Sequence, residues 1–169
     1  MLKKQYFLLI IATVVIMLGM QSIDSHLKTD AAPNGIISFE FAGDISTAQA
    51  IIVSWSGPAM FYAGLSMGLD FLFLVAYSIT IAIGCILIGS RLESRWLTLG
   101  YWLAGAQILA AILDIIENLS LIGLLAGSTN ALLPPLACWC AGPKFILVGS
   151  GLIYLICGSI AILWHRTRT

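Results

Sequence analysis

Charged side chains are scarce in this sequence, and their scarcity excludes several functions. Asp, Glu, Lys and Arg make up 9% of the 169 residues, and eight basic residues balance eight acidic ones. A chain without a basic excess offers no electrostatic footprint for nucleic acid, so we expect no such partner. It contains two histidines, too few for the clustered set that holds a transition metal. We therefore expect neither a metal site nor a cofactor.

Cysteine is also sparse, and its spacing does not favour redox chemistry. Cys138 and Cys140 have one residue between them, which differs from the Cys-x-x-Cys motif and makes a disulfide strained. Cys85 and Cys157 lie within apolar segments. We expect all four to be small packing residues.

What the chain has in abundance is apolar sequence. Hydrophobic residues make up 60% of it, and its mean hydropathy is +1.01, more than a soluble core of this size can bury. Because a membrane-crossing helix needs roughly 17 to 25 residues, we predict an all-α, four-helix membrane bundle. It forms a single integral membrane domain over residues 1–169, with spans at about 6–20, 58–88, 96–126 and 135–164.

The flanking charges predict the orientation of these spans. Basic residues gather at the two termini and in the second connection, whereas acidic residues dominate the first connection, so the positive-inside rule places both termini in the cytoplasm. No small-x-small cleavage pattern follows the first segment, which we therefore expect to be a retained span rather than a signal peptide. The basic residues are Lys3, Lys4, Arg91, Arg95, Arg166 and Arg168, and the first connection holds Asp24, Asp30, Glu40 and Asp44 against Lys28.

The long first connection, residues 21–57, carries two local patterns. Residues 36–41 alternate in the manner of a short extended segment. Ser46-Thr47-Ala48-Gln49 matches a capping box, and it predicts an amphipathic helix at about 47–55. With Ile51, Ile52 and Trp55 on one side, this helix is expected to lie in the outer interface as a lid on the bundle.

Gly142-Pro143 interrupts the fourth span. A proline inside a helix removes a backbone donor and clashes with the preceding turn. We therefore expect residues 138–144 to be kinked or partly unwound.

Three acids, an amide and a lysine stand out inside the predicted spans. A charge at the centre of a spanning helix costs roughly 2.5 to 3.5 kcal/mol, so such residues face protein or water and mark a functional site by default. Counting about 1.5 Å per residue from the cytoplasmic ends puts Asp70, Asp114 and Lys144 at one depth, near the outer hydrocarbon boundary. Glu117 and Asn118 follow Asp114 at i+3 and i+4 and share its helix face.

Two further polar residues extend this site. Tyr77 lies two turns from Asp70, and Gln107 two turns from Asp114, on the same helix faces. The simplest geometry is a polar pocket that opens outward and narrows inward. The predicted ligand-binding residues are Asp70, Tyr77, Gln107, Asp114, Glu117, Asn118 and Lys144, of which Asp70, Asp114 and Glu117 are the catalytic candidates.

Three carboxylates beside a single lysine cannot all be ionised without a large cost in free energy. One of them is expected to hold a proton or to face a bound cation, which suits acid-base chemistry, proton coupling or cation capture. The alternative is that these residues only fasten helices together, at about 0.6 kcal/mol per interaction. Intramembrane acids are expensive for that purpose, which favours a site.

A series of motifs runs along the chain: Gly35-Ile36-Ile37-Ser38-Phe39-Glu40-Phe41-Ala42, Trp55, Leu69-Asp70-Phe71, Ala76-Tyr77-Ser78, Leu113-Asp114 and Glu117-Asn118. Together these motifs resemble an uncharacterised family of small four-span bacterial integral membrane proteins. The resemblance implies this fold and a multi-pass location in a bacterial inner membrane, and no activity. In layout alone, a long outer connection over four helices with buried acids is similar to the sterol-isomerase and sigma-2-receptor superfamily. Vitamin K epoxide reductase-like proteins share a four-helix core, but their Cys-x-x-Cys is absent here.

Taken together, these patterns predict an outward-facing pocket between the second, third and fourth spans. It is expected to bind a small amphipathic or cationic ligand or the headgroup of a membrane lipid, with acid-base chemistry on it as an extension. A proton-coupled small carrier and an accessory subunit of a larger membrane complex are the alternatives.

The orientation can be tested by labelling single cysteines in a background without the native four. Cysteines at positions 28 and 130 should react with an impermeant thiol reagent added outside intact cells, because the charge bias puts both connections there. A cysteine at position 93 should stay unlabelled until the cells are broken. Labelling of position 93 in intact cells would reverse the orientation.

Overall fold

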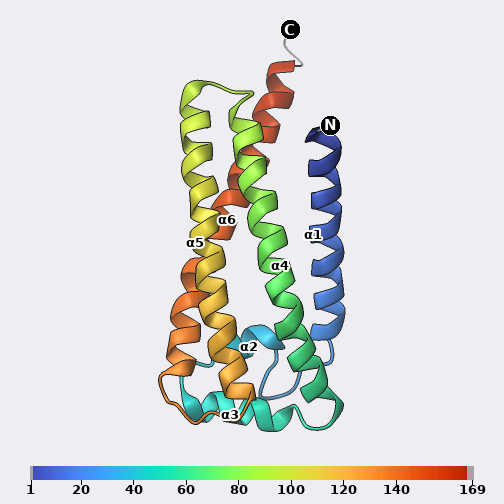
Figure 1. Cartoon of the computed structure of the whole chain (residues 1–169), viewed down its shortest axis with the longest axis vertical. Coiled ribbons are helices and arrows are strands. Elements are labelled where there is room, and N and C mark those ends of the chain that lie inside the picture. The colour runs from blue at the N-terminus through green and yellow to red at the C-terminus, as the bar shows by residue number, and fades with distance from the viewer. Residues whose placement is uncertain (1, 167–169) are drawn as a thin grey trace.

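The computed structural model describes residues 2–166 and the side chains of residues 4–164. Within these residues every regular element is a helix. Four long helices, α1 (Leu2–Asp24), α4 (Pro58–Gly89), α5 (Ser94–Leu125) and α6 (Leu133–Arg166), run along the bundle (Figure 1). All four are long and apolar enough to cross a membrane, so the described residues contain the four candidate spans that the sequence predicts. Lys3, Arg166 and Arg168, which entered the orientation argument, lie outside the described side chains.

The long helices are packed unequally. α5 packs extensively against α4 and α6, and α1 packs mainly on α4, where the Thr13 and Thr80 hydroxyls lie 2.8 Å apart. α1 begins and α6 ends at the same end of the bundle, and two short helices, α2 (Ile36–Glu40) and α3 (Ile45–Ser54), lie across the other end (Figure 1). We call this the α2–α3 end.

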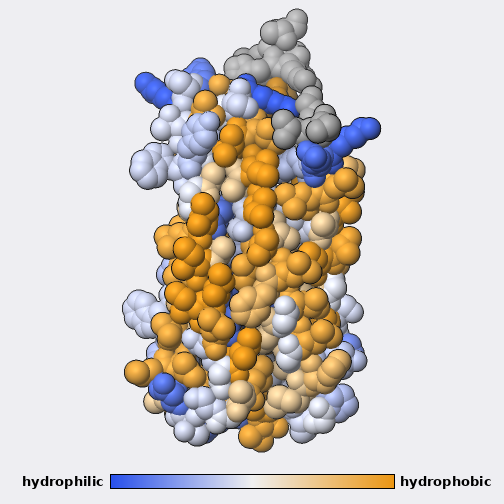
Figure 2. Space-filling view, viewed as in Figure 1, coloured by the Kyte–Doolittle hydropathy of each residue, from blue (hydrophilic) through white to orange (hydrophobic). Residues whose placement is uncertain are grey.

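The sides of the bundle are apolar. Figure 2 shows hydrophobic residues over most of its length and hydrophilic ones mainly towards its ends. Large apolar side chains such as Leu8, Trp102 and Ile146 are more than 60% exposed. A surface of this kind is unfavourable in water and matches a lipid environment, which is the reason the helices can be apolar on every face.

α2 corrects the prediction of an extended segment at residues 36–41. The segment is helical, and the Asp24 carboxylate at the end of α1 accepts a 2.7 Å hydrogen bond from the Ile36 N–H at its start. Helical spacing turns Phe39 and Glu40 inward, whereas Ile37 is 46% exposed. The hydrogen bond to the distant Asp24 therefore outweighs the local alternation of residues 36–41, which would favour an extended segment.

α3 confirms the predicted short helix but not its predicted cap. The helix begins one residue before Ser46, and Asp44 is its N-cap, accepting from the Thr47 N–H at 2.9 Å. The hydroxyls of Ser46 and Thr47 also donate to the Asp44 carboxylate. These hydrogen bonds lower the pKa of Asp44 to about 2. A carboxylate caps the positive end of a helix better than a hydroxyl, which is the reason the cap moves.

The sequence predicts a kink or partial unwinding at residues 138–144, and α6 contradicts the unwinding. It is helical without a break from Leu133 to Arg166, with Pro143 inside it. Membrane helices tolerate an internal proline because neighbouring groups and small adjustments of the backbone can satisfy the freed carbonyl.

The α2–α3 end has its own apolar core, which we call the α3-side core. Trp55 is fully buried in it, and its indole N–H donates to the Leu27 carbonyl at 2.7 Å. Its ring contacts Phe39 edge-on, with centroids 5.3 Å apart. The lid-like packing of α3 on the bundle thus depends on one anchor. The buried members are Leu27, Ala32, Phe39, Ala48, Ile51, Trp55, Ala63, Met67, Leu121, Leu124 and Ala137.

Removal of this anchor should loosen the segment that precedes α4. Trp55→Ala is expected to cost about 3 to 5 kcal/mol, because it leaves a cavity and an unpaired carbonyl. Val53, which is 77% exposed on the same helix, supplies the control, and Val53→Ala should cost less than about 0.5 kcal/mol. Limited proteolysis of residues 21–57 in detergent should accelerate for the first variant alone. Equal protection of both would show that α3 is not held by Trp55.

Candidate functional site

Three spans bring the predicted polar residues to one level. Asp70 lies 12 residues after the start of α4 at Pro58, and Lys144 lies 11 residues after the start of α6 at Leu133. Asp114 lies 11 residues before the end of α5 at Leu125. At 1.5 Å per residue, all three are about 17 Å from the α2–α3 end. The common depth expected from residue counting is confirmed by their contacts.

Asp114 is the most connected side chain at this level. Its Oδ2 accepts a 2.8 Å hydrogen bond from the Tyr77 hydroxyl. Its Oδ1 lies 3.1 Å from the Lys144 Nζ and accepts a 3.4 Å bond from Asn118. The Asn118 amide also donates to the Asp70 carboxylate at 2.5 Å. Asn118 therefore holds two carboxylates, one from α4 and one from α5, beside each other.

Lys144 is the cation of the site. Its Nζ lies 2.9 Å and 2.8 Å from the two carboxylate oxygens of Glu117, one turn from Asp114 on α5. The Phe145 ring centroid lies 4.8 Å from the same Nζ. These contacts hold the ammonium between α5 and α6.

Glu40 is a fourth acid that the sequence argument did not assign to the site. It reaches the site from α2, with Oε2 4.0 Å from the Lys144 Nζ. The residue is 7% exposed, and its buried Oε2 has no hydrogen-bond partner among the described residues. The signal available in the sequence was an acid placed between Phe39 and Phe41. The prediction of an extended segment hid this signal, because neighbouring side chains alternate in an extended segment and Glu40 would then face away from Phe39.

The setting of Glu40 changes its titration. Burial is the main cause that raises its pKa from the ordinary 4.5 to about 8. The ammonium of Lys144 opposes this rise, and the other carboxylates add to it. A pKa raised by packing means that Glu40 takes up a proton as α2 settles in place. The resulting stabilisation is complete below about pH 4.5 and is lost as the pH rises through about 8.

Gln107 lies apart from these residues. Its amide nitrogen donates to the Leu147 carbonyl of α6 at 3.0 Å, so it ties α5 to α6 rather than binding a carboxylate. Its buried Oε1 has no partner in the described part of the chain. Of the seven predicted site residues, the structure brings six together and leaves Gln107 two turns away.

We call the five charged residues the charge cluster; its side chains are buried. Exposure ranges from 0% for Glu117 to 8% for Asp70, so the cluster is closed in this structure, unlike the open pocket expected from the sequence. Four carboxylates surround one ammonium, and within residues 4–164 no group of acids, histidines and cysteines is arranged as a metal site. The members are Glu40, Asp70, Asp114, Glu117 and Lys144.

Apolar packing closes the cluster on two sides. The α3-side core includes Met67, one turn before Asp70, and Leu121, one turn after Glu117. Beyond Asp70 towards the termini, a second core begins at Leu74, which we call the termini-side core. The charges therefore lie between two layers of apolar packing, where electrostatic interactions are stronger than in water. The buried members of the second core are Leu74, Tyr77, Ile81, Cys85 and Tyr154.

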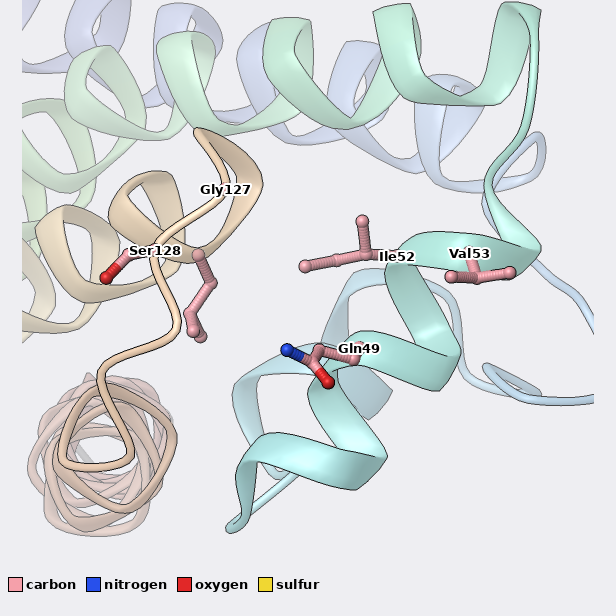
Figure 3. Close-up of a pocket in the computed structure, with 6 residues that line it drawn as sticks. Gln49, Ile52, Val53, Gly127 and Ser128 are labelled. Atoms are coloured by element: carbon pink, nitrogen blue, oxygen red, sulfur yellow. The ribbon is translucent and has the colours of Figure 1, made fainter.

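A hollow of about 310 Å³ lies elsewhere, between α3 and the turn after α5 (Figure 3). Its lining includes Gln49 and Ser128 and is otherwise apolar or glycine. None of the lining residues belongs to the charge cluster. The hollow is thus a feature of the α2–α3 end and does not open the cluster.

Comparison of the chain with protein-family models, curated proteins and solved structures finds no match. The geometry of the charge cluster is therefore the main guide to function.

Lys144 should be the least replaceable member of the cluster. Lys144→Met leaves buried acids without their cation and is expected to cost about 3 to 5 kcal/mol. Adding Glu117→Gln to that variant should recover part of the loss, because it removes an uncompensated charge. Asp70→Asn alone should change the melting temperature little. Thermal unfolding in mild detergent measures all three, and a loss in Asp70→Asn equal to that in Lys144→Met would identify the residues as helix-fastening groups only.

Proposed function

We propose that this membrane protein binds a small cationic, amphipathic molecule or an ammonium-bearing lipid headgroup at its charge cluster. One observation carries the proposal: four buried carboxylates share a single ammonium. With all groups ionised the cluster would have a charge of −3, which a low-dielectric interior does not tolerate. Protons or a bound cation must supply the balance.

A ligand would enter beside the acids whose charge the Lys144 ammonium compensates least. Asp114 and Glu117 each lie within 3.1 Å of the Lys144 Nζ. Asp70 is held by Asn118, and Glu40 is 4.0 Å from the ammonium. These last two are also the most exposed of the four acids, at 8% and 7%. An added cation would therefore bind on the side of Asp70 and Glu40.

The surroundings favour an apolar tail on that cation. Phe41 on α2 stacks on Phe145 of α6, with centroids 6.1 Å apart, and both rings are partly exposed. Aromatic faces attract ammonium groups and pack against alkyl chains. Proton transfer to or from a bound amine is open to the same carboxylates, with a protonated one as acid and an ionised one as base.

We also propose that the α2–α3 end faces outward and that the protein lies in a bacterial inner membrane. The charge bias of the connections supports the first statement, and the family resemblance supports the second. The termini-side core favours a binding protein over a carrier, because an apolar layer lies between the cluster and the other end.

The proposal is tested with decylammonium as the probe and decanol as its uncharged counterpart. At about a hundredfold excess over its Kd, decylammonium should raise the melting temperature by about 5 to 10 °C, and decanol should not. Asp70→Asn should weaken binding of the probe at least tenfold, about 1.4 kcal/mol. Asp30, an exposed acid of the same connection, supplies the control, and Asp30→Asn should bind as the parent does.

Two results would contradict this function. Equal stabilisation by decanol would show that the cluster does not recognise charge. Equal binding by the Asp70 and Asp30 variants would place the ligand elsewhere. Repeating the measurement in nanodiscs with phosphatidylethanolamine or phosphatidylcholine separates a lipid headgroup from a free amine, since a bound primary-ammonium lipid should compete with the probe.

A further inference from the structure

α2 differs from every other element that contributes to the charge cluster. The other contributors are helices of 32 to 34 residues, whereas α2 has five. Glycines lie on both sides of it, Gly35 at φ 59° and Gly43 at φ 73°. These are left-handed conformations that glycine adopts without strain and other residues rarely adopt. The segment is thus a short helix between two positions whose backbone conformation suits glycine.

The two ends of α2 are held by carboxylates of unequal quality. At its start, Asp24 accepts the Ile36 N–H at 2.7 Å. At its end, Glu40 is 4.0 Å from Lys144 and its buried Oε2 lacks a hydrogen bond from any described residue. A buried polar atom without a hydrogen bond costs free energy. Of the two carboxylates, Glu40 is therefore the weaker attachment, and Phe39 beside it is the apolar contact that movement of α2 would have to break.

A cation has few other ways into the cluster. The α3-side core and the termini-side core close it along the bundle axis, and three packed spans close much of its side. Movement of α2 would expose Glu40 and the cluster without separating any pair of spans. The Phe41 and Phe145 rings lie at the same edge and would part in this movement.

We propose that α2 is the gate of this site, turning at Gly35 and Gly43, and that Glu40 is the first carboxylate to pair with the incoming ammonium. The proposal rests on the proposed function for the identity of the ligand. It adds the route of entry and a binding residue outside the spans. On closure, Glu40 carries the ammonium to the side of Asp70.

Titration of Glu40 supports the same movement. The pKa of Glu40 is about 8 when α2 is packed, against the ordinary 4.5. A rise in pH therefore increases the population of the open state relative to the closed state. The groups that face Glu40 are Asp70 from α4, Asp114 and Glu117 from α5, and Lys144 from α6. Opening should therefore become more frequent as the pH rises towards about 8.

The native Cys140 provides a reporter of opening. It is 5% exposed and lies one turn before Lys144 on α6. In a background with Cys85→Ser, Cys138→Ser and Cys157→Ser, its rate of modification is measured with two ethyl methanethiosulfonates, one bearing trimethylammonium and one bearing sulfonate. The cationic reagent should react at least tenfold faster. Glu40→Gln should reduce this preference at least threefold, and Asp30→Asn should leave it unchanged.

The pH arm uses the same two proteins. The parent should be modified increasingly faster than its Glu40→Gln variant as the pH is raised to about 8. Ionisation of the thiol is common to both proteins, so the ratio of their rates isolates Glu40. A ratio independent of pH, or a cation preference that survives Glu40→Gln, would remove Glu40 from the gate.

A reversible lock tests the movement itself. In a background without the native cysteines, Phe41→Cys and Phe145→Cys are joined by a short bis-methanethiosulfonate. Decylammonium should bind at least tenfold more slowly to the locked protein than to the same double variant before cross-linking, and a reductant should restore the rate measured before cross-linking. The Phe41→Cys single variant, treated identically, supplies the control, and its binding rate should not change when the reductant is added. Because locked and released states are the same molecule, a folding defect cannot produce the difference.

The two proposals fail in different ways. Rapid binding of decylammonium to the locked protein would overturn the gate and leave the binding function standing. Absence of decylammonium binding in the unlocked parent would overturn the function, while the Cys140 rates would still decide whether α2 opens.

Discussion

The ammonium of Lys144 is the interaction on which the arrangement of this bundle depends. It lies between Asp114 and Glu117, and it is the one ammonium that the described structure places among the buried carboxylates. Removing an ammonium from water costs several kcal/mol unless close carboxylates replace the lost hydration. α6 must therefore sit where α5 supplies two acids. Asn118 then draws in α4 through Asp70, and the remaining attraction reaches Glu40 on α2.

Much of this arrangement could be predicted from local sequence. Apolar length gave the four spans, and the i, i+3, i+4 spacing put Asp114, Glu117 and Asn118 on one face. Counting residues along straight helices brought Asp70 and Lys144 to the same level. These predictions succeed because membrane helices are regular and because a buried charge has few places where it can be compensated.

The features that escaped prediction depend on contacts between distant residues. α2 is helical because Asp24, 12 positions earlier, bonds to its first amide. Glu40 joins the cluster only because that helix turns it inward beside Phe39. α6 remains helical through Pro143, and the turn around the proline is held by the buried Cys140 and Lys144 on either side of it. The hydrogen bond from Asp24 lies outside the window of sequence that shows the alternation.

The termini-side core, from Leu74 to Tyr154, has a consequence for energetics across the membrane. Under the proposed function, an ion or proton that reaches the cluster from the α2–α3 end meets this apolar layer and leaves by the same route. Exchange of this kind completes no circuit, so it would neither dissipate an electrochemical gradient nor draw work from one. The occupancy of the cluster would then follow the composition of the single compartment that the α2–α3 end faces.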